Sequence, residues 1–333
     1  MPQLRQNIVT GEWVVIAPER AKRPDDFVAK IEKIEAHTEC IFCVGSSAHM
    51  NRLVGFDTKY TYTMPNKYPA FVIEGDHEVR SYNPEEGFYQ VKPAVGGHDV
   101  IVVTEGNDTL LTFKKEVIVD LFQSFKNRYA YYRKDPSVQY VIAIYNHGEA
   151  AGASIAHPHA QIFATGVIPN HIVAETHGSE RYYEISGHCV FCEIIAHEQK
   201  EKVRVLAEND RFIMFTFFAS RFPFEMWILP KQHQSMYESI TAEENIDLAI
   251  IFQTGLSMLD KTLKNPSLNF YIHSLPTTSE QADYYHWHLE IAPRVSMYAG
   301  FELGSGTVID VVSPEKAAEF LRHPDTGQPK EEA

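Results

Sequence analysis

The sequence has few cysteines, no long apolar run and no concentrated positive charge. Only four of its 333 residues are cysteine, and no stretch of about 18 apolar residues is present that could span a membrane. The opening MPQLRQNIVTGEW lacks the apolar core of a signal peptide. The net charge of −14, without a long basic block, argues against broad nucleic-acid binding through phosphate neutralisation. We therefore expect a cytoplasmic protein with no membrane or nucleic-acid partner. A local basic pocket for a small phosphorylated ligand is still allowed.

All four cysteines occur in two closely spaced pairs. Cys40 and Cys43 belong to CIFC, and Cys189 and Cys192 belong to CVFC. In a reducing compartment such pairs are more typical of metal or redox sites than of structural disulfides. The alternative is that one pair consists of ordinary small core residues.

The length and the 44% hydrophobic content favour two domains, or two halves that share one sheet. Each half shows the same order of a cysteine pair, an apolar strand, a long helix, a second strand and a His-x-His strand. In the first half these elements are HDVIVVT at 98–104, a helix at about 114–134, VQYVIAIYN at 138–146 and HPHAQIFA at 157–164. In the second half they are FEMWILP at 224–230, a helix at about 241–263, LNFYIHS at 268–274 and YHWHLEIAP at 285–293.

This repeated order predicts an α+β fold made of two duplicated halves. Each half is expected to be an antiparallel sheet with a long helix packed on one face. We place the domains at 1–175 and 176–325, and expect a frayed tail at 326–333. The second long helix has Thr241 and Glu244 at the spacing of a capping box.

The segment HPHAQ carries the strongest chemical signal. In a strand, residues two apart point to the same side, so His157, His159 and Gln161 are predicted to share one face. Pro158 cannot donate to a ladder and places the segment at the start or edge of a sheet. The preceding loop, with glycines at 148 and 152 and Ser154, offers backbone N–H groups and a hydroxyl to an anion. The alternative is a pair of partly buried histidines with structural hydrogen bonds.

An imidazole next to an anion-binding loop indicates phosphoryl chemistry. A neutral imidazole can attack phosphorus and form a covalent intermediate that divides one difficult step into two. Gln161 can bind a phosphoryl oxygen without acting as a base. The absence of a base there favours transfer to a second substrate over hydrolysis by water.

Six ordered motifs, from about residue 4 to about residue 322, are similar to those of the histidine triad superfamily. The chain resembles in particular the galactose-1-phosphate uridylyltransferase family, including plant-type ADP-glucose phosphorylase. The motifs are EWVVIAPERAKRP at 12–24, CIFC at 40–43, NKYPA at 66–70, the loop with HPHAQ at 146–161, PFEMWILPKQH at 223–233 and HWHLEIAP at 286–293. The resemblance implies two histidine-triad-like domains, with the active site in the first.

The resemblance also implies a ping-pong nucleotidyl transfer and a role for each matching residue. His159 matches the nucleophile, and Gln161 matches the residue that binds the phosphoryl oxygens. Arginine can meet two phosphate oxygens at once, and Arg20 and Arg23 match such positions, although ordinary surface charge is the alternative. The implied substrate-binding residues are Arg20, Arg23, Asn66, Asn146, Gly152, Ser154 and Glu302.

By resemblance, the chain holds one or two structural zinc ions. The first would be bound by Cys40, Cys43 and His157. Its usual fourth position is Asn107, a poor zinc ligand, so water, His98 or His49 would complete the site, or the site is empty. The second would be bound by Cys189, Cys192, His233 and His286. An alternative second set is Glu175, His273, His286 and His288, and His286 cannot easily serve both.

The resemblance implies a nucleotide sugar and a hexose 1-phosphate as substrates, and a homodimer. The expected activity is that of a UDP-glucose–hexose-1-phosphate uridylyltransferase of galactose metabolism. The alternatives are an adenylyltransferase similar to ADP-glucose phosphorylase and a nucleotide-binding relative without catalytic activity. A glutamine pattern expected near Val308 is absent, which leaves the sugar end and the base open.

Overall fold

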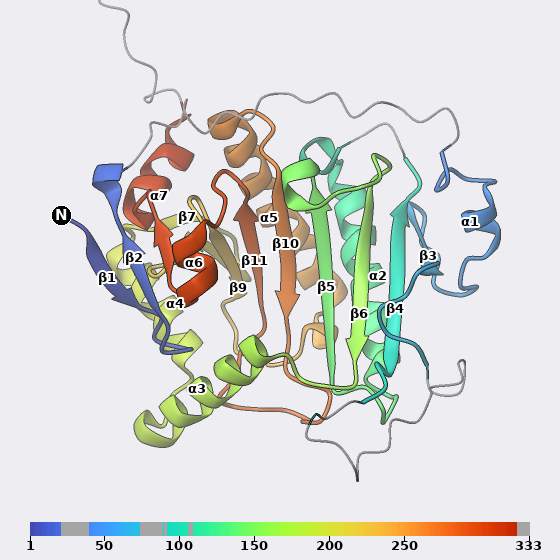
Figure 1. Ribbon diagram of the computed structural model, residues 1–333, viewed down its shortest axis with the longest axis horizontal. Coiled ribbons are helices and arrows are strands. Elements are labelled where there is room, and N and C mark those ends of the chain that lie inside the picture. The colour runs from blue at the N-terminus through green and yellow to red at the C-terminus, as the bar shows by residue number, and fades with distance from the viewer. Residues whose placement is uncertain (21–39, 74–88, 90–91, 106–108, 325–333) are drawn as a thin grey trace, which may run out of the picture.

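A large antiparallel sheet runs through the whole molecule (Figure 1). The computed structural model describes residues 1–20, 40–73, 89, 92–105 and 109–324. Within these residues the sheet has nine strands. In spatial order they are β3 (Thr61–Pro65), β4 (Gly96–Val103), β6 (His159–Thr165), β5 (Tyr140–His147), β10 (Leu268–His273), β11 (His288–Pro293), β9 (Met226–Pro230), β8 (Phe212–Thr216) and β7 (Val205–Glu208).

The two sequence halves meet in the middle of this sheet, where β5 pairs with β10. In that pairing Asn269 lies opposite Asn146. The strand order on one side of the junction, β5-β6-β4-β3, repeats on the other side as β10-β11-β9-β8. The predicted α+β fold of antiparallel strands with packed helices is thereby confirmed. The halves share one sheet, and the domain boundary at residue 175 stays a prediction.

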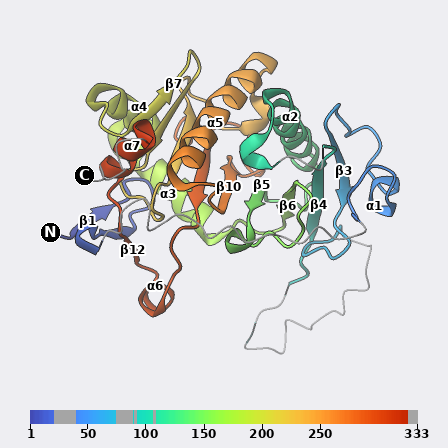
Figure 2. The same cartoon turned by 90° about the horizontal axis from the view of Figure 1, so that it is seen from above.

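The two long helices, α2 (Lys115–Tyr132) and α5 (Ala242–Leu263), cover one face of the sheet (Figure 2). Phe122 and Phe125 of α2 pack with Phe252 of α5 against Phe270 of β10. Burying side chains of this size contributes about 1.5–3 kcal/mol each, so this layer supplies much of the core. Thr241 accepts from the Glu244 N–H and Glu244 accepts from the Thr241 N–H, which confirms the predicted capping box.

The second half carries additional elements at its outer end. A small sheet joins the first strands of the chain to a late one: β1 (Gln3–Gln6), β2 (Trp13–Ile16) and β12 (Val308–Asp310). The remaining helices are α1 (Ser47–Met50), α3 (Asn170–Ser186), α4 (Val190–Glu201), α6 (Gly300–Ser305) and α7 (Pro314–Arg322). Short 3-10 turns are η1 (Pro18–Arg20), η3 (Leu110–Thr112), η4 (Glu149–Ala151) and η5 (Tyr237–Ser239). No helix among the described residues has the length and hydrophobicity needed to cross a membrane.

Alternation along β4 and β6 separates the core from an open face. Ile101 and Ile162 point to the helix-covered side and join the main core. Val100 and Val102 point to the other side, where they form a small cluster with Phe42, Tyr62 and Met64. Val102 pairs with His159, and Val100 pairs with Gln161. Because paired residues face the same side of a sheet, His159 and Gln161 lie beside this small cluster.

We predict that Gly178→Ala destabilises the protein. Gly178 lies in α3, and a Cβ there would come within 1.8 Å of the Val9 carbonyl oxygen. This overlap should cost about 1–3 kcal/mol despite the better helix propensity of alanine. Gly304→Ala in α6 is the matched control, because a Cβ at that position meets nothing within 4 Å. Chemical denaturation should show a lower midpoint for the first variant alone, and equal midpoints would contradict the close packing of α3.

Candidate functional site

His159 is the first residue of β6, and its ring is held by the backbone just before it. The Nδ1 atom lies 2.9 Å from the carbonyl oxygen of His157. A carbonyl can only accept, so Nδ1 carries the hydrogen and the lone pair resides on Nε2. Burial lowers the pKa of His159, which favours the neutral ring. The geometry therefore presents an uncharged nitrogen with an available lone pair.

The His159 side chain lines a cavity of about 880 Å³ on the open face of the sheet. Four residues predicted from the sequence meet there, namely Asn66, Ser154, His159 and Gln161. Phe42, from the turn before α1, lies in the same wall. Ser47 begins α1 and Asn51 follows it, and both also line the cavity. Lys67, which the sequence reasoning missed although it lies in the NKYPA motif, adds a positive charge. The cavity thus combines polar donors, one cation and apolar surface, as a phosphorylated organic ligand requires.

The loop after β5 also approaches the site. Gly148 and Gly152 have φ values of 81° and 84°, a conformation that favours glycine. A Cβ at Gly148 would also lie 2.1 Å from Ser267 Oγ. Asn146 is the last residue but one of β5, and its Oδ1 accepts from Asn269 Nδ2 at 2.8 Å. Since Tyr145 pairs with Ala160, Asn146 lies next to His159 on the neighbouring strand.

Of the predicted substrate residues, Glu302 does not line this cavity among the described residues, and two arginines cannot be placed. Glu302 lies on α6, where its carboxylate accepts from the Ala299 N–H, and α6 contributes no side chain to the described lining. Arg20 ends η1, and its side chain is outside the described part of the structure. Arg23 also lies outside the described residues, so both arginines remain predictions.

Cys40, Cys43 and His157 come together as the first metal-capable cluster. Their ligand atoms lie within 4.8 Å of one another. Nδ1 of His157 is 3.2 Å from Cys40 Sγ and 3.9 Å from Cys43 Sγ. The opposite nitrogen, Nε2, lies 2.7 Å from the Val103 carbonyl oxygen and must donate to it. This bond leaves Nδ1 as a lone-pair ligand, the usual arrangement around a bound metal.

No fourth ligand of the first cluster is present among the described side chains. His49 accepts the Gly45 N–H at Nδ1 and packs its ring against Tyr62. His98 has both ring nitrogens engaged elsewhere, with Ala70 and Gln161. Neither histidine therefore completes the site as the sequence analysis allowed. Asn107 falls outside the described residues.

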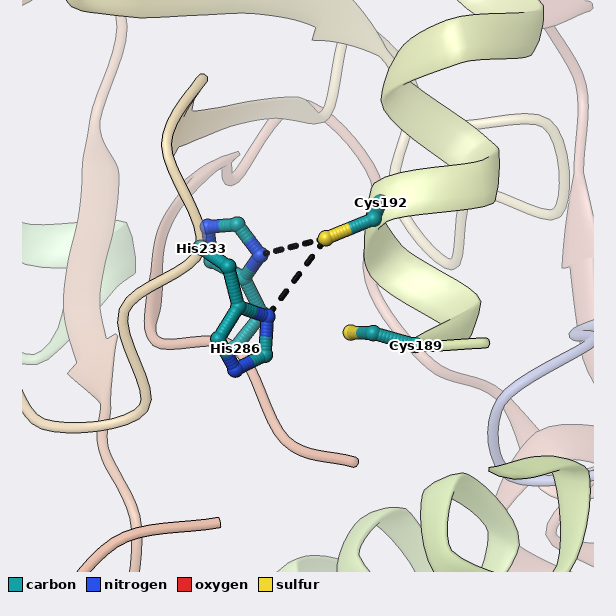
Figure 3. Close-up of side chains that lie close together, drawn as sticks. All are labelled: Cys189, Cys192, His233 and His286. Carbon is teal, nitrogen blue, oxygen red and sulfur yellow. Dashed lines mark hydrogen bonds between the residues drawn. The ribbon is translucent and has the colours of Figure 1, made fainter. Parts of the chain in front are cut away.

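The second cluster joins Cys189, Cys192, His233 and His286, with ligand atoms again within 4.8 Å (Figure 3). Cys192 lies in the first turn of α4, and the two histidines face it from the loops after β9 and before β11. Cys192 Sγ is 3.4 Å from His233 Nδ1 and 3.6 Å from His286 Nδ1. His233 Nε2 lies 3.1 Å from the Ala282 carbonyl oxygen, so Nδ1 is again the free ligand.

The chemistry of this donor set fits a tetrahedral metal ion. The neighbouring Cys192, together with His233 and His286, lowers the pKa of the Cys189 thiol, whereas Cys189 in turn raises the pKa of Cys192, so the pair without a metal favours one thiolate. Two thiolates and two neutral imidazoles form a common structural zinc set. When bound, zinc would fasten the start of α4 to the loops beside β9 and β11. The assignment of this metal ion as zinc is a proposal.

The alternative second metal set assembles in part: Glu175, His273 and His288 lie together, but His286 does not join them. His286 belongs to the cysteine cluster, whereas Glu175 and His273 gather with His171 and Glu290 in a separate buried group. Glu175 Oε1 lies 3.0 Å from His273 Nδ1 and 3.7 Å from His288 Nε2. Although burial alone lowers it, the nearby carboxylates of Glu175 and Glu290 raise the pKa of His288 to about 10. The carboxylates therefore have a cation from the chain itself, and Arg221 supplies a second, 3.0 Å from Glu290.

This buried group is the second-half counterpart of the cavity. HPHAQ and HWHLE place His288 where the first half has His159, and Glu290 where it has Gln161. The His288 Nδ1 atom lies 3.1 Å from the His286 carbonyl oxygen, just as in the first half. In the second half Glu175 from α3 fills the space beside the ring, and the residue is fully buried. The first-half imidazole, in contrast, lines a cavity.

Comparison with known proteins decides the family. A model described as the N-terminal domain of galactose-1-phosphate uridyl transferase matches residues 1–169, just over half of the chain. The chain belongs to the galactose-1-phosphate uridyl transferase family. A second model, described as a domain of unknown function (DUF4921), matches residues 108–323. As a member of this family the chain is an enzyme of the nucleotidyltransferase class, which confirms the predicted class.

Similar proteins cover nearly the whole chain. ADP-glucose phosphorylase of Arabidopsis thaliana is 33% identical, over 96% of this chain and 92% of that protein. Galactose-1-phosphate uridylyltransferase of Thermotoga maritima is 27% identical, over 97% and 98% respectively. A crystal structure of an ADP-glucose phosphorylase from Arabidopsis thaliana with bound ADP-glucose superposes with a TM-score of 0.80 at 30% identity, covering 97% of this chain and 99% of that one.

We predict that the protein, isolated without chelator, contains two zinc ions per chain, one in each cysteine cluster. Cys40→Ser and Cys189→Ser should each remove about one ion, because loss of a thiolate leaves an incomplete ligand set. His273→Asn is the control, since the buried carboxylate group should hold no ion. Elemental analysis of the three variants measures this, and loss of an ion in His273→Asn would contradict the assignment.

Proposed function

We propose that the protein transfers a nucleoside monophosphate from a nucleotide sugar to a second phosphate-bearing acceptor, with His159 as the covalent carrier. The observation that carries this proposal is the hydrogen bond between His159 Nδ1 and the His157 carbonyl oxygen. It leaves the Nε2 lone pair available inside a cavity large enough for a nucleotide. Membership of the family supports the same reaction class.

The reaction has two balanced steps. In the first, Nε2 attacks the α-phosphorus of the nucleotide sugar, and the bond to the bridging oxygen breaks, so that hexose 1-phosphate leaves. In the second, a phosphate oxygen of the acceptor attacks the same phosphorus, and the N–P bond breaks. The imidazole is neutral before and after the cycle, so neither step needs an additional base. Exchanging one phosphoanhydride bond for another keeps the overall energy change small.

Polar groups around the ring stabilise the charged phosphoryl oxygens. We assign Gln161 to the α-phosphate, and Asn146, Gly152 and Ser154 to the diphosphate. Gln161 and Ser154 line the cavity with His159, and Asn146 lies beside it. Donors placed in advance around a developing charge are typically the largest single contribution to such catalysis. The two zinc ions have a structural part here, because they anchor the loops on which His157 and His286 lie.

The donor of first choice is UDP-glucose, with hexose 1-phosphate as acceptor, which places the protein in galactose metabolism. A second candidate is ADP-glucose, and two observations favour it. The relative named ADP-glucose phosphorylase is 33% identical, against 27% for the uridylyltransferase of Thermotoga maritima. The cysteine-containing second cluster, which is the plant-type pattern, assembles in the structure. A homodimer is part of the proposal by resemblance alone.

We predict that His159→Asn abolishes formation of the covalent nucleotidyl adduct without unfolding the protein. Asparagine keeps polarity near the Nδ1 position but has no lone pair at the Nε2 position, so the attack on phosphorus is lost. Intact-mass spectrometry after quenching with the donor measures the adduct. His197→Asn, on the exposed side of α4, is the matched control and should still react. An adduct of unchanged amount on His159→Asn would remove His159 from the reaction.

We predict that one of the two donors labels the protein much faster than the other. A base pocket that satisfies the hydrogen-bonding edge of one base leaves buried polar groups unpaired with the other, which should give a preference of about 100-fold or more. Incubation with UDP-glucose and ADP-glucose separately, followed by rapid quenching, measures the two adduct rates. Faster labelling by ADP-glucose would replace the first candidate by the second.

A further inference from the structure

Gln161 and Asn146 are both carboxamides, and each can present either an oxygen or an NH2 group to a ligand. The two ends have opposite effects on a phosphate, because phosphoryl oxygens accept hydrogen bonds and repel another acceptor. A rotation of about 180° about the terminal bond exchanges the ends at little steric cost. The site therefore needs something that sets the direction of each carboxamide.

The orientation of the Gln161 carboxamide is set by the Ala70 backbone N–H, acting through His98. The Ala70 N–H donates to His98 Nδ1 at 3.2 Å, and a backbone N–H can only donate. The neutral His98 ring must then carry its hydrogen on Nε2, which lies 2.8 Å from Gln161 Oε1. Gln161 consequently receives this hydrogen bond on its oxygen and directs its NH2 group away from His98.

His98 is itself firmly held in that orientation. Its ring stacks on Phe163 at 4.0 Å between centroids, and the residue is 8% exposed. Burial lowers its pKa, which preserves the neutral tautomer. The Asn66 Nδ2 atom, 3.1 Å from the same Nε2, has no lone pair available to accept its hydrogen.

The direction of Asn146 follows in the same way from a backbone carbonyl. Asn269 Nδ2 lies 2.8 Å from the Ala151 carbonyl oxygen, which can only accept. The group at that position must be an NH2, and its other hydrogen goes to Asn146 Oδ1 at 2.8 Å. Asn146 thus has its oxygen engaged and its NH2 group directed away from Asn269. Asn269 belongs to β10, so this contact comes from the second half of the chain.

We propose that His98 and Asn269 are positioning residues for nucleotidyl transfer, which hold the oxygens of Gln161 and Asn146 so that both NH2 groups face the phosphoryl oxygens. The inference rests on the proposed function of His159. Neither residue touches the reacting atoms, and each acts through its carboxamide. Without the anchor, the carboxamide rotates, and in part of the population an oxygen faces the phosphate.

A double-mutant cycle tests the part of His98. His98→Leu should lower the rate of adduct formation at saturating donor by about 10- to 100-fold, with donor affinity changed far less. In a Gln161→Ala background the same substitution should change the rate by less than about twofold, because no carboxamide is left to orient. His98→Gln, which can offer an N–H at the Nε2 position, should restore most of the rate. Melting temperatures of all variants check that the fold is retained.

A second cycle pairs Asn269→Leu with Asn146→Ala and has the same expected form. The inference would be overturned if His98→Leu lowered the rate equally with and without the Gln161 carboxamide, or Asn269→Leu equally with and without that of Asn146. A merely structural role does not depend on the carboxamide. A wild-type protein that forms no adduct would overturn the proposed function instead. The two failures are therefore distinguishable in one set of rapid-quench measurements.

Discussion

The proposed chemistry of this protein depends on a single hydrogen bond between an imidazole and the backbone two residues before it. His159 Nδ1 is committed to the His157 carbonyl oxygen, and this places the reactive lone pair on Nε2. This carbonyl lies just before β6, which begins at His159. His157 is held on its other side by the Val103 carbonyl oxygen and the cysteine pair. A proposed structural metal is thus one residue away from the nucleophile, and it stabilises the backbone that sets the tautomer.

The duplication shows what distinguishes a reactive histidine from a structural one. His288 makes the same backbone hydrogen bond in the second half, but its Nε2 faces Glu175 and Glu290 instead of a cavity. Those carboxylates raise its pKa and favour the protonated ring, which has no lone pair to offer. At the equivalent place beside His159 the first half has Gln161, which is uncharged. Glutamine instead of glutamate at one strand position, and the absence of a Glu175 counterpart beside the described part of the cavity, thus separate the proposed nucleophile from a buried cation.

The same halves remain connected through the shared sheet. β5 and β10 pair at the junction, and their paired residues Asn146 and Asn269 are hydrogen-bonded across it. The second half, although its own counterpart site is filled, supplies the Asn269 side chain that donates to Asn146 beside the proposed active site. This gives a physical reason for the two halves to have kept a continuous sheet.

Local patterns were sufficient to predict much of the architecture. The strands β4, β5, β6, β9, β10 and β11 and the helices α2 and α5 lie where apolar alternation, helical periodicity and the Thr241 cap placed them. Periodicity works for these elements because each exposes one face to a core. The small sheet of β1, β2 and β12 could not be predicted. Its pairing of β2 with β12 joins strands about 300 residues apart, and only the tertiary structure brings them together.

For the site, the sequence by itself determined the chemical groups: two cysteine pairs, two His-x-His segments and a glutamine two residues after the first. These depend only on residue type and a spacing of two or three, which local geometry translates directly into shared faces. Tertiary structure alone decided which of these side chains lie together in one cluster. It assigned His286 to the cysteines and not to Glu175, and turned His98 from a possible metal ligand into the partner of Gln161. Such choices depend on which strands and loops lie within about 4 Å of one another in space, and no spacing along the chain encodes that distance.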